Sequence, residues 1–326
     1  MWKYLITINK NLVYAIPALM AAGLVFGNLV GNSMVSSLKQ LIVPMTFLMV
    51  YPMMVTLNIN HLLKGLKLPL QASALALNFL IIPFIAYVIG RFFFASQPYM
   101  ALGILLAALL PTSGMTISWT GFAKGNMGAA INMTVIGLTT GSLATPFYVS
   151  ALYGAEMEVN IAAVIKQIVL IVFLPMLIGF MTRQLLLKKY SQEDFKKRIA
   201  PRFPALSTVG VLGIVFVAMT LKAKTITSEP TQLLIIFLPL IILYLINFSL
   251  STLAGKLFFS RGDAIALVYG TVMRNLSIAM AIAINAFGDA GTDAALVIAL
   301  AYIIQVQSAA WYVRFTDRIF GPPTQS

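Results

Sequence analysis

Residues 110–120 read LPTSGMTISWT and interrupt a long apolar stretch with a proline, a glycine and five hydroxyl side chains. Pro111 has no backbone N–H and restricts the residue before it, and Gly114 adds backbone freedom three residues later. Backbone groups freed by such a break must find partners where hydrocarbon surrounds them. We therefore predict a broken membrane-spanning helix here. Its hydroxyls either line the break or bond back to their own helix.

A second interrupted stretch, residues 270–277 (GTVMRNLS), occupies the corresponding place in the second half of the chain. The segments after the two stretches, FAKGN at 122–126 and NAFGD at 285–289, match at an offset of 163. GRFF at 90–93 and GKLF at 255–258 match at an offset of 165. Each match is weak alone, and chance similarity between apolar segments is the alternative. Together they pair the halves in order and indicate an internal repeat.

The composition excludes a soluble globular protein. Of the 326 residues, 60% are apolar and 10% charged, whereas soluble domains are about 45–50% apolar and about 25% charged. A helix that crosses a bilayer needs about 20 apolar residues. We predict spans at 12–32, 40–58, 68–90, 98–121, 127–153, 160–182, 206–222, 231–254, 264–286 and 292–313. They leave no room for a soluble domain, and no A-x-A-like site follows the first span to indicate a cleaved signal peptide.

These observations predict an all-α polytopic membrane protein with ten transmembrane helices. The helices would form two inverted five-helix repeats, residues 1–158 and 159–326, because an odd number of spans returns the second half from the opposite side. Helices four and nine would be discontinuous and cross. Carriers built in this way hold their substrate near the midplane, at helices broken in corresponding positions.

The basic residues predict the orientation. Of 22 lysines and arginines, 16 fall on the side of the N-terminus, four on the other side and two, Lys166 and Arg274, within spans. Cytoplasmic loops carry such an excess. We therefore expect both termini in the cytoplasm of a cell (inner or plasma) membrane. Topology thus explains the net charge of +13 without nucleic acid. Lys166 lies close enough to a span end to reach the interface.

Two residue types restrict the chemistry. Cysteine is absent, which excludes disulfides, thiolate metal sites and a cysteine nucleophile. The single histidine, His61, is expected in a short polar surface loop. No span holds a Ser/His, paired-aspartate or HExxH arrangement, so an enzyme is disfavoured. A channel is disfavoured too, because no ring of charge or glycine-rich filter is present.

Arg274 is the most informative residue. It is the eleventh of 23 residues in its predicted span, where a charge costs about 2.5–3.5 kcal/mol on mild scales. No Asp or Glu lies in the interior of a span to pair with it. It either caps carbonyls of a broken helix or serves as a fixed cation for an anionic substrate. The predicted substrate-binding residues are Thr112, Ser113, Met115, Thr116, Arg274, Asn275 and Ser277. Candidate neutral ligands for a cation are Asn78, Thr116, Thr134 and Thr271.

Taken together, these stretches resemble the bile acid:sodium symporter superfamily, including its arsenite-efflux branch. That branch has a Pro-Cys…Met…Trp…Lys-Gly pattern, which Pro111, Met115, Trp119, Lys124 and Gly125 match apart from the cysteine. The segments 78–83 and 273–275 match the family's third and ninth helices in placement. The resemblance covers essentially the whole chain. It implies a rocking or elevator-like carrier with a panel domain (spans 1, 2, 6 and 7) and a core domain (spans 3–5 and 8–10).

The chain departs from this family where ligands bind. Thr112 stands where the arsenite carriers have a thiol, and Ser277 where they have an acidic residue, so thiolate capture of arsenite is excluded. The sodium symporters of the family have two sodium sites. At positions of one site this chain has Gly270, Arg274, Asn275 and Asn78. At the other site, Thr116 and Thr134 keep the hydroxyl ligands, whereas Ile117 and Ala130 replace polar ligands. The resemblance therefore implies that Arg274 replaces at least one coupled cation, with Na+ as the candidate coupling ion.

The expected function is secondary active transport of a small organic anion across the cell membrane by alternating access, with altered or reduced sodium coupling. One alternative is an efflux carrier for a metalloid such as arsenite or antimonite, or for a neutral solute, in which Arg274 is purely structural. Another is a membrane receptor that binds ligand without turnover. The predicted partners are a small anionic solute and the lipid bilayer. No cofactor, nucleic acid or protein partner is implied.

Overall fold

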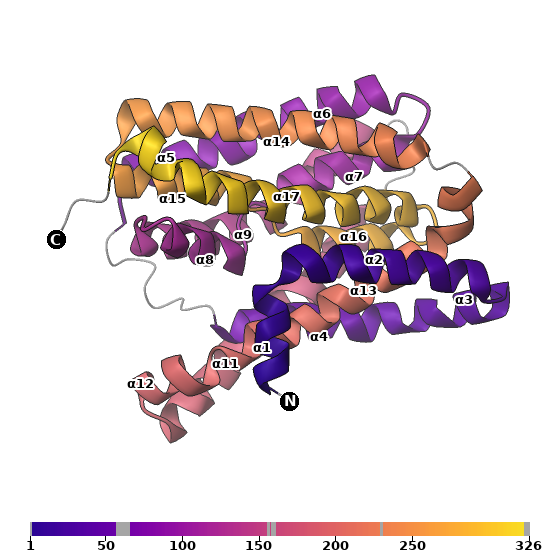
Figure 1. The fold of residues 1–326 in the computed structure, drawn as a ribbon, viewed down its shortest axis with the longest axis horizontal. Helices are drawn as coiled ribbons and strands as arrows, with labels where there is room; N and C mark the ends of the chain where they lie inside the picture. Colours follow the sequence, from indigo (N-terminus) through magenta and orange to yellow (C-terminus); the bar gives the residue numbers. More distant parts are fainter. Residues whose placement is uncertain (1, 57–65, 155–156, 158–160, 229–230, 323–326) are drawn as a thin grey trace. The chain divides into compact units, whose positions relative to one another are not determined.

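The computed structural model describes residues 2–56, 66–154, 157, 161–228 and 231–322, and its elements are helices (Figure 1). The predicted loop of His61 and the predicted repeat boundary at 158–159 lie outside the described residues. The chain divides into two compact units. One comprises Met1–Leu57, Asn160–Leu234 and Ser277–Ala299, and the other Asn58–Val159, Ile235–Leu276 and Leu300–Ser326.

The first unit is built around a long helix, α13. Its helices are α1 (Trp2–Lys10), α2 (Leu12–Leu29), α3 (Asn32–Leu38), η1 (Lys39–Leu41), α4 (Ile42–Thr56), α10 (Ile161–Ile168), η4 (Val169–Phe173), α11 (Leu174–Lys189), α12 (Gln192–Asp194), η5 (Phe195–Ile199), α13 (Arg202–Ser228) and α16 (Leu276–Phe287). α13 packs against α2 and α4, and α4 against α11. Glycines permit the close approach: a Cβ on Gly27 or Gly210 would lie 2.5 Å from Thr220 O or Met49 N, respectively.

The second unit contains the first predicted broken helix. Its helices are α5 (Leu68–Leu75), η3 (Ala76–Ile81), α6 (Ile82–Phe93), α7 (Pro98–Leu109), α8 (Gly114–Phe122), α9 (Met127–Tyr153), α14 (Thr231–Phe258), α15 (Arg261–Val272) and most of α17 (Gly291–Phe320). α6 packs against α7, while α9 contacts α5, α7, α8 and α15. Leu70, Met133 and Leu267 belong to one buried apolar cluster of this unit.

Helix occupies each of the ten predicted span ranges. Among the described residues, six helices are long and apolar enough to cross a membrane: Leu68–Phe93, Met127–Tyr153, Ile161–Lys189, Gln192–Lys224, Leu233–Phe258 and Gly291–Phe320. Shorter apolar helices lie at Tyr14–Leu29, Pro44–Thr56, Pro98–Leu109 and Leu276–Phe287. The chain is thus an all-helical, multi-span membrane protein. The inverted repeat, and the panel and core domains, stay predictions.

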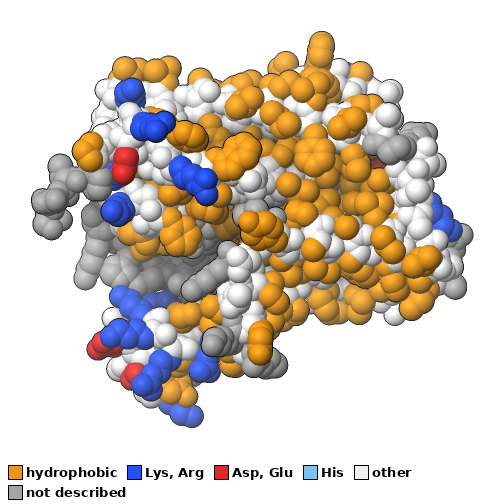
Figure 2. Space-filling model, in the orientation of Figure 1, with side chains coloured by type: hydrophobic (Ala, Val, Ile, Leu, Met, Phe, Trp, Pro, Cys, Tyr) orange, Lys and Arg blue, Asp and Glu red, His pale blue; other side chains and the backbone are white. Residues whose placement is uncertain are grey.

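The surface suits a lipid environment. Large apolar side chains are exposed on α2 and α14; Leu29 is 79% and Leu245 is 62% exposed. A soluble protein rarely leaves long apolar helices uncovered in this way. In Figure 2, apolar side chains are spread over the visible surface of α2 and α14, whereas lysines and arginines gather over α11 and α12 and over the ends of α14 and α15 at the left of the view.

Candidate functional site

Both interrupted stretches are breaks in helices, and the breaks meet. The first separates α7 from α8 at residues 110–113, and the second separates α15 from α16 at residues 273–275. Thr112 N donates to Met273 O at 2.7 Å, and Asn275 N donates to Leu110 O at 2.7 Å. The result is a short antiparallel bridge in which each break satisfies backbone groups of the other. This matters because unpaired backbone groups are costly where water is excluded.

Thr112 adopts a conformation that is rare for a threonine. Its φ is +67° and it is fully buried. The hydroxyl donates to Pro111 O at 2.6 Å and to Thr134 O at 3.1 Å. Such a left-handed threonine persists only where its surroundings hold it. The bridge and the contact with α9 provide that support.

Ser113 and Thr116 begin the helix after the first break. Ser113 is the N-cap of α8, and its Oγ accepts from Met115 N at 3.2 Å. Thr116 Oγ1 accepts from Ser113 N at 3.1 Å, which completes a reciprocal cap. Both side chains are buried, whereas Met115 is half-buried. Their hydroxyls therefore satisfy the helix start, one of the two roles expected for this stretch.

Arg274 lies within the bridge and is 3% exposed. Its Nη1 donates to Asn78 Oδ1 at 2.8 Å. Asn78, itself 2% exposed, donates through Nδ2 to Gly270 O at 3.0 Å. Arg274 Nη2 is buried and has no hydrogen-bond partner among the described residues. The guanidinium is thus held on one side and has one donor left over.

Amide side chains from other helices hold the second break. Gln305 Oε1 accepts from Arg274 N at 2.7 Å, and its Nε2 donates to Arg274 O at 3.2 Å. Tyr244 donates to the same Oε1 at 2.9 Å, while Asn247 Nδ2 donates to Thr271 O at 3.0 Å. The sequence predictions did not assign Gln305, Tyr244 or Asn247 to the site. Polar amides in the middle of apolar spans were the available signal, since such groups need partners in a membrane.

The structure brings some predicted residues together and not others. Thr112, Arg274, Asn275 and Asn78 meet at the two breaks, and Thr134 contributes its carbonyl. The hydroxyls of Thr134 and Thr271 bond instead to their own helices, at Ala130 O (2.7 Å) and Val268 O (3.0 Å). Ser277 lies in α16, within the first unit. The binding roles predicted for these residues stay predictions.

A separate polar cluster surrounds Asp263, in the first turn of α15. Its carboxylate accepts from Lys67 at 2.5 Å, from Asn126 at 2.7 Å and from Ser260 at 3.2 Å. Burial alone raises the pKa of Asp263, but these hydrogen bonds and the charge of Lys67 more than offset it, so the pKa is lowered. The cluster therefore holds an ionised carboxylate that joins the chain before α5 to the N-termini of α9 and α15.

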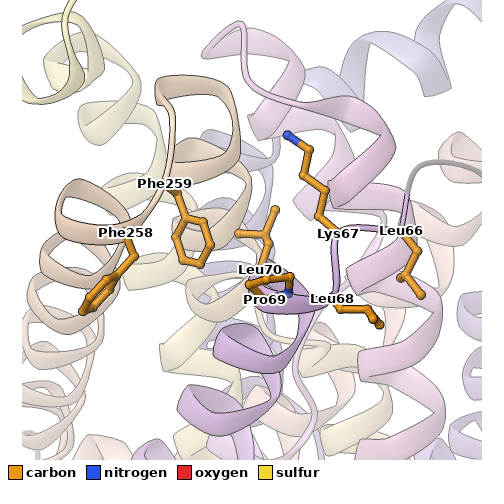
Figure 3. Close-up of a pocket in the computed structure, with 7 residues that line it drawn as sticks. All are labelled: Leu66, Lys67, Leu68, Pro69, Leu70, Phe258 and Phe259. Carbon is orange, nitrogen blue, oxygen red and sulfur yellow. The ribbon is translucent and has the colours of Figure 1, made fainter.

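An open hollow of about 530 Å³ lies next to this cluster (Figure 3). It is lined by Leu66, Lys67, Leu68, Pro69, Leu70, Phe258 and Phe259. None of these residues belongs to either helix break. Its apolar lining, with one lysine whose amine already bonds Asp263, lacks the convergent polar groups that orient a small solute.

Comparison with known proteins finds a matching family model and several similar proteins. A family model described as "Sodium Bile acid symporter family" matches residues 43–229, more than half of the chain. An arsenical-resistance protein Acr3 of Alkaliphilus metalliredigens is 24% identical over 83% of this chain and 80% of its own length. An Acr3 of Corynebacterium glutamicum is 21% identical over 69% and 64%, respectively. An uncharacterized transporter of Synechocystis is 23% identical over 80% and 73%.

Proposed function

Because this chain belongs to the sodium bile acid symporter family, a family of membrane transporters and not of enzymes, we propose that it is a secondary carrier that exports a small neutral, hydroxylated solute of the arsenite type. The bridge between the two helix breaks is the observation that carries this proposal. Broken helices at corresponding positions are where carriers of this architecture bind their substrates. The arsenical-resistance relatives, similar over most of the chain, favour this class of solute.

The proposed binding chemistry is hydrogen bonding. The chain has no cysteine, so no cysteine thiolate of this protein can bind a trivalent metalloid. Arsenite is a neutral trihydroxyl species at neutral pH, and its hydroxyls can exchange hydrogen bonds with the polar groups around the breaks. In this reading Arg274 is structural. Its bond to Asn78 and the clamp of its backbone by Gln305 support that role, because both fix the break.

The same proposal includes the architecture expected from the sequence. Ten spans would form two inverted five-helix repeats, with a panel domain and a core domain that move relative to each other during alternating access. Both termini would lie in the cytoplasm of the cell membrane. The occurrence of one break in each half of the chain, at an offset of 163 between Pro111 and Arg274, supports the repeat.

A small organic anion is the second candidate solute. The observation that favours it is the buried Arg274 Nη2, which lacks a partner among the described residues. A guanidinium with a spare donor can bind a carboxylate. Under this candidate the fixed charge replaces at least one coupled sodium ion, and Asn78, Thr116, Thr134 and Thr271 would be the residues near any sodium site that is retained.

Counterflow in proteoliposomes distinguishes the candidates. Purified protein is reconstituted and exchange is measured for arsenite, antimonite and a panel of small carboxylates, with and without sodium. We expect arsenite exchange in the absence of sodium. Exchange of carboxylates alone would establish the second candidate, and binding without any exchange would indicate a receptor.

Arg274→Gln tests the role of the charge, with Lys256→Gln, an exposed basic residue of the same unit, as the control. For a neutral solute, we expect Arg274→Gln to lower protein stability while the affinity of the remaining folded protein changes little. For an anion, affinity should fall and sodium dependence should change. Unchanged affinity and parent-like sodium dependence would contradict the anion candidate.

A further inference from the structure

A basic surface lies at the end of the first unit where α11 stops. Its exposed lysines and arginines are Lys188, Lys189, Lys196, Lys197, Arg198 and Arg202, and we call this set the basic platform. Two exposed acids lie among them. Glu193 pairs with Lys197 at 2.5 Å, and Asp194 pairs with Arg198 at 4.0 Å. The other four basic residues have no acidic partner in the part of the chain that the structure describes.

The basic platform is a folded surface and not a loose tail. Phe195, in the middle of the segment, is 2% exposed and lies under the guanidinium of Arg183, 5.0 Å from the ring centroid. Arg183 in turn donates to Thr56 O at 3.4 Å. Ser191 caps the short helix α12 by accepting from Asp194 N at 3.0 Å. These contacts hold the segment against the rest of the unit and leave residues 196–198 exposed.

An aromatic helix adjoins the basic platform. Arg202 lies over the ring of Trp2, with its guanidinium carbon 5.7 Å from the centroid. Trp2 begins α1, a helix of nine residues that packs against α13 and carries Tyr4, which is 76% exposed. Figure 1 shows α1 and α12 at the same end of this unit. Tryptophan and tyrosine are enriched where a membrane meets water, so this end has the composition of an interface.

We propose that the basic platform binds the headgroups of anionic phospholipids in the surrounding bilayer. It occupies the last residues of the candidate span Ile161–Lys189 and the first residues of the candidate span Gln192–Lys224, where the chain turns between the two spans, which places it at headgroup level. Clusters of four to eight basic residues next to a span are attracted to anionic lipid, and each lysine or arginine increases binding about fivefold. The platform is therefore a lipid site of the transporter as well as a topology signal. This inference does not depend on the identity of the transported solute.

Trp2 provides a reporter for the test. In a Trp119→Phe/Trp311→Phe background it is the only tryptophan left. The protein is reconstituted in phosphatidylcholine vesicles that contain brominated phosphatidylglycerol or, in a parallel series, brominated phosphatidylcholine. We expect the anionic lipid to quench Trp2 more strongly at the same mole fraction. Lys188→Gln/Lys189→Gln/Lys196→Gln should remove most of this preference, and salt should weaken it in the parent.

A triple variant with the same loss of charge is the control. Lys256→Gln/Arg314→Gln/Arg318→Gln neutralises three exposed basic residues of the second unit, and we expect it to keep the preference. Equal quenching by the two lipids in the parent would overturn the proposal. So would an equal loss of preference in the two triple variants, because a general effect of net charge would then suffice. Thermal midpoints of all variants are compared to confirm that each is folded.

Discussion

Arg274 carries a permanent charge with only 3% of its surface exposed. Removing such a charge from water costs several kcal/mol unless hydrogen bonds and opposite charges compensate for it. The described partner of its side chain is the neutral amide of Asn78, whose other end is fixed to Gly270 O. A hydrogen bond to a charged group contributes about 1.5–3 kcal/mol. The hydrogen bond to Asn78 thus offsets part of the free-energy cost of burying the Arg274 guanidinium at the second break.

Asn78→Leu should therefore destabilise the protein by about 1.5–3 kcal/mol, because it leaves the guanidinium without its described acceptor. The measurement is the thermal midpoint in detergent. The double variant Asn78→Leu/Arg274→Met removes charge and acceptor together and should be more stable than Asn78→Leu alone. If the loss of stability of the double variant equals the sum of the losses of Asn78→Leu and Arg274→Met measured separately, the two side chains are not energetically coupled.

The sequence predicted the positions of the two helix breaks better than the hydrogen bonds around them. The offset of 163 paired Pro111 with Arg274, and these are the residues that the antiparallel bridge joins. A proline in an apolar run and an arginine near a span centre are strong local signals. The partners of polar side chains were not predictable in the same way. Gln305 reaches Arg274 from α17, and its contact depends on how α15 and α17 pack, which apolar composition does not specify.

At the scale of elements, α9 is the helix against which the first break rests. A Cβ on Gly141 would lie 2.9 Å from both Leu109 O and Pro111 Cδ, and a Cβ on Gly137 would lie 3.0 Å from Thr112 Oγ1. The helix interior generally disfavours glycine by about 1 kcal/mol relative to alanine. These two glycines are therefore explained by the space that the break requires.

Gly141→Ala should destabilise the protein by about 1–3 kcal/mol, as overpacking does in other well-packed interiors. Transport should fall in proportion to the fraction of protein that remains folded, because the added methyl group would displace the break. Gly128→Ala is the control on the same helix: its nearest neighbour would be Asn126 Oδ1 at an ordinary 3.4 Å. We expect it to be neutral or slightly stabilising. Thermal midpoints that rank the variants in the opposite order would refute the packing argument.

The Asp263 cluster joins elements instead of lining a break, and it predicts an acid sensitivity. The pKa of Asp263 is lower in the folded protein than its usual value of about 3.9. Its stabilising contribution is therefore present above that value and is lost as the pH falls below it towards the lowered pKa. The thermal midpoint of the parent should fall more steeply below about pH 4 than that of Asp263→Asn. Lys67→Gln should give an intermediate slope, whereas identical slopes for all three proteins would exclude this carboxylate as the cause.

For the whole molecule, the apolar runs predicted where helices occur but not where they end. Helix is present in each predicted range, because about 20 apolar residues are a strong signal for a span. The ends differ: α13 runs over Arg202–Ser228 and α17 over Gly291–Phe320, beyond the predicted 206–222 and 292–313. Hydropathy marks the part of a helix that suits hydrocarbon. The backbone continues into polar residues, where capping and packing decide the end.

The orientation of the whole chain can be tested because the protein contains no cysteine, so a single introduced thiol is labelled without background. Ser96 and Lys188 are both exposed and fall on opposite sides of the predicted topology. In intact cells, a membrane-impermeant thiol reagent should label Ser96→Cys, while Lys188→Cys should react only after permeabilisation. We expect this pattern because the segments on the side of Lys188 carry the excess of basic residues that is typical of cytoplasmic segments. The reverse pattern would invert the topology, and labelling of both in intact cells would contradict an odd number of crossings between residues 96 and 188.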